Sequence, residues 1–173
     1  MPVVTENLPE CAIRYFDGQN TLLHLARRTN RDWMADVLSV VAGAKGIAHA
    51  GVEAATMFGT VTIDDLRRSL LPVSESGARD LLKLLAVGSF YWGPEESLHR
   101  PDPVRDKCVR DTLQAVGSGA DFFTNHGHAE DGYEADFLQA GFHFNSLATT
   151  LYDICLIAVS PDFLLVAWRF EDA

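Results

Sequence analysis

The chain has 173 residues, of which 47% are hydrophobic and 22% charged, and its formal net charge at pH 7 is −10. This length and apolar content describe a globular protein with enough apolar side chains to bury a core. The longest apolar runs, such as residues 151–159, fall well short of the roughly 20 residues that cross a bilayer, so no membrane partner is expected.

The first ten residues contain neither a positively charged region nor an apolar stretch, which is not the pattern of a secretion signal. We therefore expect a cytoplasmic protein. Three widely spaced cysteines, Cys11, Cys108 and Cys155, form no Cys-x-x-Cys pair. Their odd number and spacing argue against a disulfide framework and against a cysteine zinc site. Cys155 lies in an apolar run and is predicted to be a core residue.

The N-terminal part is predicted to be mostly helical. Residues 11–16 have the composition of a short strand that closes in the turn-prone residues 17–20. The apolar residues at 22, 23, 25 and 26 then follow at helical spacing, with Asn20 as the N-cap. A second helix places Trp33, Val37, Val40 and Val41 on one face. Residues 42–59, rich in Gly and Ala, are predicted to continue the helical region.

Residues 61–92 have the pattern of two helices separated by a turn. Thr62 and Asp65 form a capping box for the first helix, and a proline then interrupts it. Ser74 or Ser76 caps the second helix, which has a buried leucine face. A strand would follow Gly88.

This segment resembles the winged helix-turn-helix units of transcriptional regulators and the dimerisation domains of small-molecule methyltransferases. Four basic residues, Arg79 and Lys83 among them, are balanced by four acidic ones, so the segment has no net charge. A DNA reader needs an excess of Lys and Arg. We therefore expect a packing module, and nucleic acid is not an expected partner. The 81 residues that follow position 92 are too few for a methyltransferase domain.

The C-terminal part is predicted to be rich in strands. A helix over 104–116 ends at the glycines of 117–119, and an acidic segment then leads to three strands over 142–147, 150–159 and 163–170. The last two are apolar on both faces, so helices must cover at least one side of their sheet. The sequence predicts a single α+β domain over 1–173. A helical lobe, about 20–116, would contain the helix-turn-helix-like unit and pack on a small, mostly antiparallel sheet in a β-rich lobe, about 142–172.

Catalytic signatures are missing from the sequence. It has no Gly-x-Ser-x-Gly, no phosphate-binding Gly-x-x-x-x-Gly-Lys and no His-Glu-x-x-His. His126 and His128, together with nearby carboxylates, have the donor atoms that zinc, manganese or iron prefer. Their spacing matches no metal motif, and the segment has loop composition. We expect no catalytic residue, no metal, no cofactor and no enzymatic activity, with a metal-dependent enzyme at this cluster as an alternative.

The acidic segment is the most informative feature of the sequence. After Arg110 the chain has one basic and ten acidic residues, a net charge of −9. Such a segment is commonly a solvated loop. Here, however, aromatic residues are interleaved with the acids, as in an interface where aromatic anchors supply buried area and carboxylates supply steering. The predicted partner-binding residues are Glu130, Asp131, Tyr133, Glu134, Asp136 and Phe137, with Tyr133 or Phe137 as the anchor.

A small acidic α+β chain that ends in the apolar hairpin strand of residues 163–172 resembles the immunity proteins that bacteria keep against their own toxins. The resemblance implies a non-enzymatic inhibitor that neutralises a basic effector or toxin by occluding its active site. A phage-type inhibitor that mimics nucleic acid with its acids belongs to the same class. A winged-helix transcriptional regulator acting through residues 61–92 is the other alternative.

Overall fold

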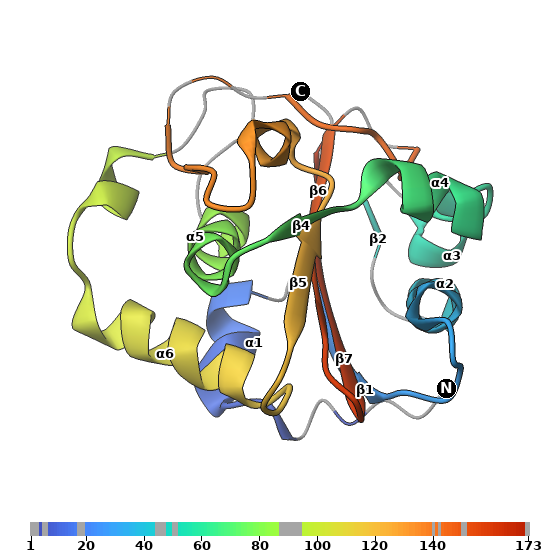
Figure 1. Cartoon of the computed structure of the whole chain (residues 1–173), viewed down its shortest axis with the longest axis horizontal. Coiled ribbons are helices and arrows are strands. Elements are labelled where there is room, and N and C mark those ends of the chain that lie inside the picture. The colour runs from blue at the N-terminus through green and yellow to red at the C-terminus, as the bar shows by residue number, and fades with distance from the viewer. Residues whose placement is uncertain are drawn as a thin grey trace.

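A five-stranded antiparallel sheet, in the order β1-β7-β6-β5-β4, lies at the centre of the computed structural model (Figure 1). The structure describes residues 4, 7–16, 20–43, 48–49, 52–86, 95–139, 141, 143–149 and 152–171. The strands of the sheet are β1 (Thr21–Arg27), β4 (Leu71–Val73), β5 (Asp121–Thr124), β6 (Tyr152–Val159) and β7 (Phe163–Glu171). A separate two-stranded pair joins β2 (Ala48–His49) to β3 (Val52–Glu53).

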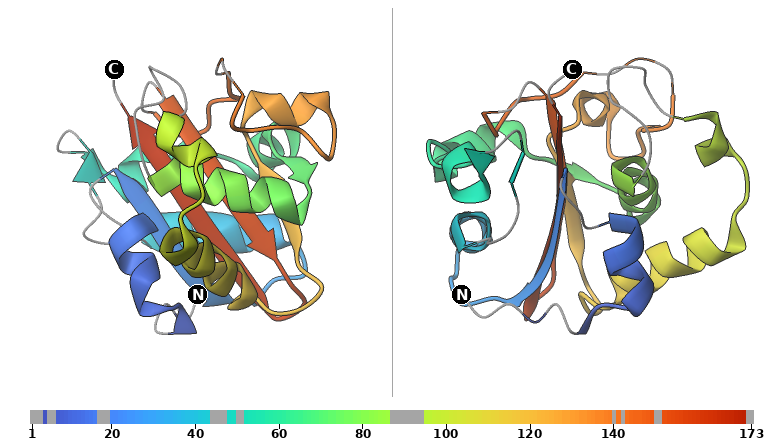
Figure 2. Two further views of the ribbon diagram at one scale, coloured as in Figure 1. Left: turned by 90° about the vertical axis from the view of Figure 1, so that its left-hand side faces the viewer. Right: turned by 180° about the vertical axis from the view of Figure 1, so that it is seen from behind.

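Helices cover both faces of the sheet, which makes three layers (Figures 1 and 2). One face carries α1 (Glu10–Phe16), α5 (Glu75–Ala86) and α6 (Pro103–Gln114). The opposite face carries α2 (Trp33–Gly43), α3 (Ala54–Met57) and α4 (Ile63–Ser69). Two short 3₁₀ helices, η2 (Glu96–His99) and η3 (Gly127–Asp131), complete the described elements. The α+β class is confirmed.

The hairpin of β6 and β7 forms the middle of the sheet, as its apolar pattern predicts. Alternate side chains point into two different cores, Leu156 and Leu165 toward α5, and Ile157 and Trp168 toward α2. All four are at most 1% exposed. Ser160 closes the hairpin, because its backbone N donates to the Phe163 carbonyl at 2.9 Å and its hydroxyl accepts from Phe163 N at 3.0 Å. Cover on both faces explains why these strands have no polar side.

Two N-terminal predictions are wrong. Residues 20–27, expected to be helical, form β1, which pairs with β7 from Thr21 to Arg27. Residues 11–16, expected to be a strand, belong to α1. The apolar residues of β1 are buried on both of its faces, so pairing with β7 outweighs the helical spacing. The expected helix over 42–59 is confirmed only in part where the structure describes it: residues 42–43 end α2 and Ala54–Met57 form the one-turn α3, but β2 and β3 lie between them.

The expected strand over 142–147 is reduced, in its described part, to one bridge between His126 and Phe144. The helices expected at 33–41 and 104–116 are confirmed as α2 and α6. Since β1 and β4 come from the predicted helical lobe, that lobe contributes two of the five strands, and the sheet extends beyond residues 142–172.

The helix-turn-helix-like unit has the predicted helices in a different arrangement. The capping box of Thr62 and Asp65 starts α4, and Ser74 caps α5 by accepting a hydrogen bond from Gly77 N at 3.0 Å. Between them, residues 71–73 form β4, which pairs with β5 and tolerates Pro72 because it is the last strand of the sheet. The two helices therefore pack in different cores on opposite faces, which is not a helix-turn-helix (Figure 1). The predicted wing, 88–92, lies outside the described residues.

A disulfide joins Cys11 of α1 to Cys108 of α6, with the Cα atoms 6.1 Å apart. This corrects the expectation that no cysteines pair. Sequence spacing did not reveal the pair because the two helices come together only in the folded layer on one face of the sheet. Cys155 is free and fully buried, as predicted. None of the described helices has the length and apolar character that crossing a bilayer requires.

Candidate functional site: an acidic loop beside a groove

The connection between β5 and β6 carries the acidic segment, and a buried polar network fixes both of its ends. Asn125 Nδ2 donates to Asp153 Oδ1 at 2.9 Å and to the carbonyl oxygens of Asn145 and Asp153 at 3.0 Å. Asn125 Oδ1 accepts from Cys155 N at 2.8 Å. Both Asn125 and Asp153 are fully buried. This network ties the start of the connection to the strand that receives its end.

Asp153 is the centre of that network. Its carboxylate also accepts from Trp168 Nε1 at 3.1 Å, from Ser146 Oγ at 3.1 Å and from Leu147 N at 2.9 Å. Burial raises the pKa of Asp153, and the hydrogen bonds that it accepts oppose that shift. Asp153 therefore has a structural role. Its carboxylate accepts from four side-chain and backbone donors that would otherwise be left without a hydrogen-bond partner.

Three histidines pack together at the base of the connection. The ring centroids of His126 and His128 are 4.7 Å apart, and those of His128 and His143 are 5.2 Å apart. His126 Nδ1 accepts from the backbone N of His128 at 3.0 Å. Burial, with a smaller contribution from the neighbouring His128 and His143, lowers the pKa of His126 to about 3, so its ring is neutral at pH 7. Gly127 is required here, because an added Cβ would lie 1.7 Å from His143 Nδ1.

The described residues contain no group of three or more His, Cys, Asp or Glu side chains arranged to hold a metal ion. His126 and His128 are instead buried in the packing of the loop. The metal-dependent enzyme proposed as an alternative therefore gains no site from this geometry.

Phe137 is a core residue and not an exposed anchor, which corrects that part of the prediction. Its side chain is 0% exposed and packs 5.2 Å, centroid to centroid, from His126. Its ring also lies against α5, where a Cβ added at Gly77 would be 2.9 Å from the ring edge. The Tyr133 carbonyl accepts from Ser74 N at 3.0 Å. Phe137 and this backbone bond hold the acidic loop on the N-terminal turn of α5.

The four predicted acids of this loop are exposed, and none forms an ion pair with any residue that the structure describes: Glu130, Asp131, Glu134 and Asp136. Two make only local contacts, as Asp136 accepts from Leu138 N at 2.9 Å and Asp131 from Gln139 Nε2 at 3.4 Å. The loop thus presents carboxylates whose charge is not neutralised within the described part of the chain.

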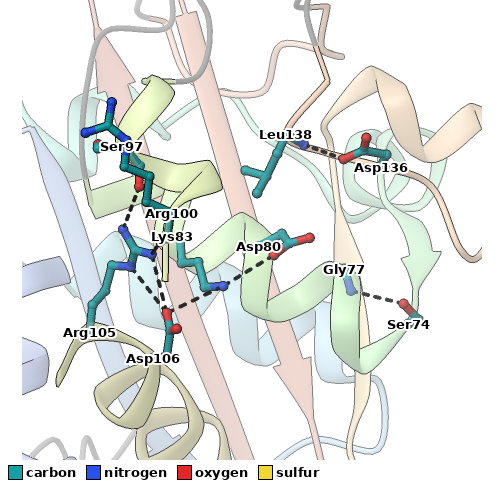
Figure 3. A network of polar contacts seen from close by, with 10 residues as sticks. All are labelled: Ser74, Gly77, Asp80, Lys83, Ser97, Arg100, Arg105, Asp106, Asp136 and Leu138. Carbon is teal, nitrogen blue, oxygen red and sulfur yellow. Dashed lines mark hydrogen bonds and ion pairs between the residues drawn. The ribbon is translucent and has the colours of Figure 1, made fainter. Parts of the chain in front are cut away.

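Lys83 of α5 and Arg105 of α6 are already paired with carboxylates. Lys83 Nζ lies 3.6 Å from both Asp80 Oδ1 and Asp106 Oδ1 (Figure 3). Arg105 extends the network, with Nε 3.4 Å from Asp106 Oδ1. Partial burial raises the pKa of Asp80, Lys83 opposes the shift, and the negative charge of Asp136 adds to it. Asp80 thus lies within the negative field of Asp136, so the acidic face reaches α5.

Tyr133 is the exposed aromatic residue of the loop, with 57% of its surface accessible. It lines a groove of about 390 Å³ together with Glu75 at the start of α5, Leu113 and Gln114 at the end of α6, and Phe122 of β5. The turn formed by residues 117–120 completes the groove, with Gly117 and Gly119 at φ of 100° and 73°. Sequence reasoning missed Glu75 and the groove, because three separate segments meet there only in the fold.

No family model, curated protein or solved structure matches this chain.

Proposed function

We propose that the protein is a non-enzymatic inhibitor that binds a basic effector or toxin through the acidic loop and neutralises it, as an immunity-type protein does. One observation carries the proposal: four exposed carboxylates that have no cationic partner in the described part of the chain lie on a loop that is anchored at its base by buried groups. Like charges gathered in this way repel one another, and a cationic partner relieves that repulsion.

The anchoring of the loop supports recognition. Phe137, the histidine cluster and the Asp153 network hold its backbone, so binding requires little ordering of the chain. Tyr133 adds an exposed ring among the acids, and tyrosine is enriched among residues that dominate binding energy. The carboxylates would speed association by long-range attraction and select against acidic partners.

The regulator alternative has less support. Its two helices lie on opposite faces of the sheet, and Lys83 of α5 lies 3.6 Å from each of two aspartates. A recognition helix needs a free basic or amide-rich face. DNA binding through residues 61–92 is therefore the weaker proposal.

Charge reversal tests the proposal. A tagged protein is used to capture partners from the native host at low salt, and proteins released by high salt are identified by mass spectrometry. The variant Glu130→Lys/Asp131→Lys/Glu134→Lys/Asp136→Lys should lose the captured basic protein. A matched control reverses four exposed acids elsewhere, Glu10, Glu53, Glu96 and Asp162.

The control variant has the same net charge as the loop variant. It therefore shows whether binding depends on the acidic loop itself or only on the total charge of the protein. We expect it to retain the partner with a modest, salt-sensitive loss. Equal capture by both variants, or the lack of any salt-released basic protein with the unaltered chain, would reject the proposed function.

A further inference from the structure

We propose that the groove under Tyr133 is a subsite for one arginine side chain of the basic partner. This inference rests on the proposed function and names the chemistry of its central contact. The groove lies between α5, α6 and the acidic loop, and its volume of about 390 Å³ is in the range of sites that enclose a ligand group.

Two features give the groove a negative potential. Glu75 supplies a carboxylate, and no Lys, Arg or His is among the lining residues. The last residues of α6, Leu113 and Gln114, also line it. The C-terminal end of a helix has the effect of roughly half a negative charge, which favours a cation. The Leu113 and Gln114 carbonyls already accept from Val116 N at 3.2 Å and from Gly117 N at 3.0 Å, so the Glu75 carboxylate is the main source of the potential. Both features belong to elements outside the acidic loop, so they are independent of its four carboxylates.

The start of α5 also borders the groove, and a helix N-terminus generally favours an anion. Here two of its donors are already used, since Gly77 N donates to Ser74 Oγ and Ala78 N to the Ser74 carbonyl. Glu75 itself also places a negative charge at that end. A cation is therefore the better match for this groove.

The apolar part of the groove fits the rest of an arginine side chain. Leu113 and Phe122, both at most 7% exposed, provide an apolar floor for its methylene groups. The exposed ring of Tyr133 offers a face for a guanidinium, which stacks on aromatic rings as a lysine ammonium does not.

Arg79 is the internal competitor for Glu75, with Nη2 3.5 Å from the carboxylate. Both side chains are well exposed, at 41% and 62%, and exposed pairs of this kind add little stability. An incoming guanidinium can therefore replace Arg79 at small cost. The backbone of Tyr133 is held by the bond that its carbonyl accepts from Ser74 N, so the residue that lines the groove has a fixed attachment to the start of α5.

The test uses an octa-arginine peptide as the probe, with affinity measured by calorimetry at low salt and an octa-citrulline peptide as the neutral control. Loss of the ring in Tyr133→Ala and of the charge in Glu75→Gln should each weaken octa-arginine binding about tenfold. Tyr133→Phe, which keeps the ring, should bind as the unaltered protein does. Glu53→Gln, the same change at an exposed position on β3, should also have no effect.

A second measurement locates the peptide. In ¹⁵N-resolved spectra, the amide signals of residues 117–120 should shift on addition of octa-arginine and not of octa-citrulline. If Tyr133→Ala and Glu75→Gln bind as Glu53→Gln does while reversal of the four loop acids abolishes binding, the subsite is wrong and the acidic-surface function stands. If the unaltered protein does not bind octa-arginine, the subsite is rejected, and the capture experiment decides the acidic surface separately.

Discussion

Removal of the Cys11–Cys108 disulfide should cost a large part of the stability of the fold. The two cysteines are 97 positions apart, so the bond closes most of the N-terminal half and the connections after it into one loop. In the chain-entropy description, closing a loop of this length removes about 16 cal/mol/K from the unfolded state, or about 4.7 kcal/mol at 25 °C. This value compares with a total stability of about 5–15 kcal/mol for a typical domain.

The loss of stability calculated from chain entropy is an upper value, because α1 keeps other contacts when the disulfide is broken. Ala12 and Phe16 are at most 2% exposed and stay packed against α5 and α6. With a urea dependence of about 2 kcal/mol/M, the unfolding midpoint should fall by up to about 2 M on reduction or in Cys11→Ser/Cys108→Ser. The double variant should then show no further response to reductant.

Urea titrations followed by far-ultraviolet circular dichroism, with and without reductant, measure this shift. Thiol titration provides a second readout. The unreduced protein in denaturant should expose one thiol, that of Cys155, and none when native, because burial also raises the pKa of that thiol. Three thiols without reductant, or identical midpoints in both conditions, would refute the reasoning. Disulfides persist in oxidising compartments, so alkylation in intact cells also tests the cytoplasmic expectation.

Three further changes probe the base of the acidic loop. Phe137→Ala should cost about 3–5 kcal/mol and increase amide hydrogen exchange over residues 130–136, since the ring is fully buried. Asp153→Asn should cost about 1–3 kcal/mol and alter the near-ultraviolet signal of Trp168, because an amide cannot accept from all the donors that converge there. His126→Asn should weaken the dependence of stability on pH between 7 and 5, as measured by urea midpoints.

The sign of the last effect follows from the lowered pKa of His126. Its value of about 3 in the folded protein lies below the usual 6.5, so under pH 6.5 only the unfolded chain takes up the proton. Stability is therefore lost as pH falls from 6.5 toward 3, by about 2 kcal/mol between pH 7 and pH 5. An asparagine can still accept the bond from His128 N. A variant with an unchanged pH slope would show that His126 titrates normally.

Sequence reasoning succeeded where one local pattern had one interpretation. The hairpin of β6 and β7 was predicted because both of its strands are apolar on both faces and a proline turn joins them. Thr62 and Asp65 form the predicted capping box because such caps depend only on residues three positions apart.

It failed where distant partners decide the structure. The apolar residues of 22–26 fit one helical face and equally a strand buried on both sides, and only β7 selects the strand. The helix of 10–16 is too short to show periodicity, and its bond to Cys108 cannot be read from spacing. Phe137 and Tyr133 both lie among acidic residues, so the sequence does not show which ring is buried. In the fold, the Phe137 ring packs against the small Gly77 on α5 and is buried, whereas Tyr133 is exposed.

In the acidic loop, the residues proposed to bind a partner are different from the residues that stabilise the fold. It is an insertion between β5 and β6, neighbours in the sheet, and its ends are fixed by Asn125 and Asp153 inside the core. The four carboxylates extend outward from that base and contribute no ion pair to the described fold. Reversing their charge should therefore leave the free energy of unfolding, measured by urea titration, within about 1 kcal/mol of the original while binding is lost. A large loss of stability would show that the loop acids support the fold, and binding data on that variant could not then locate the partner surface.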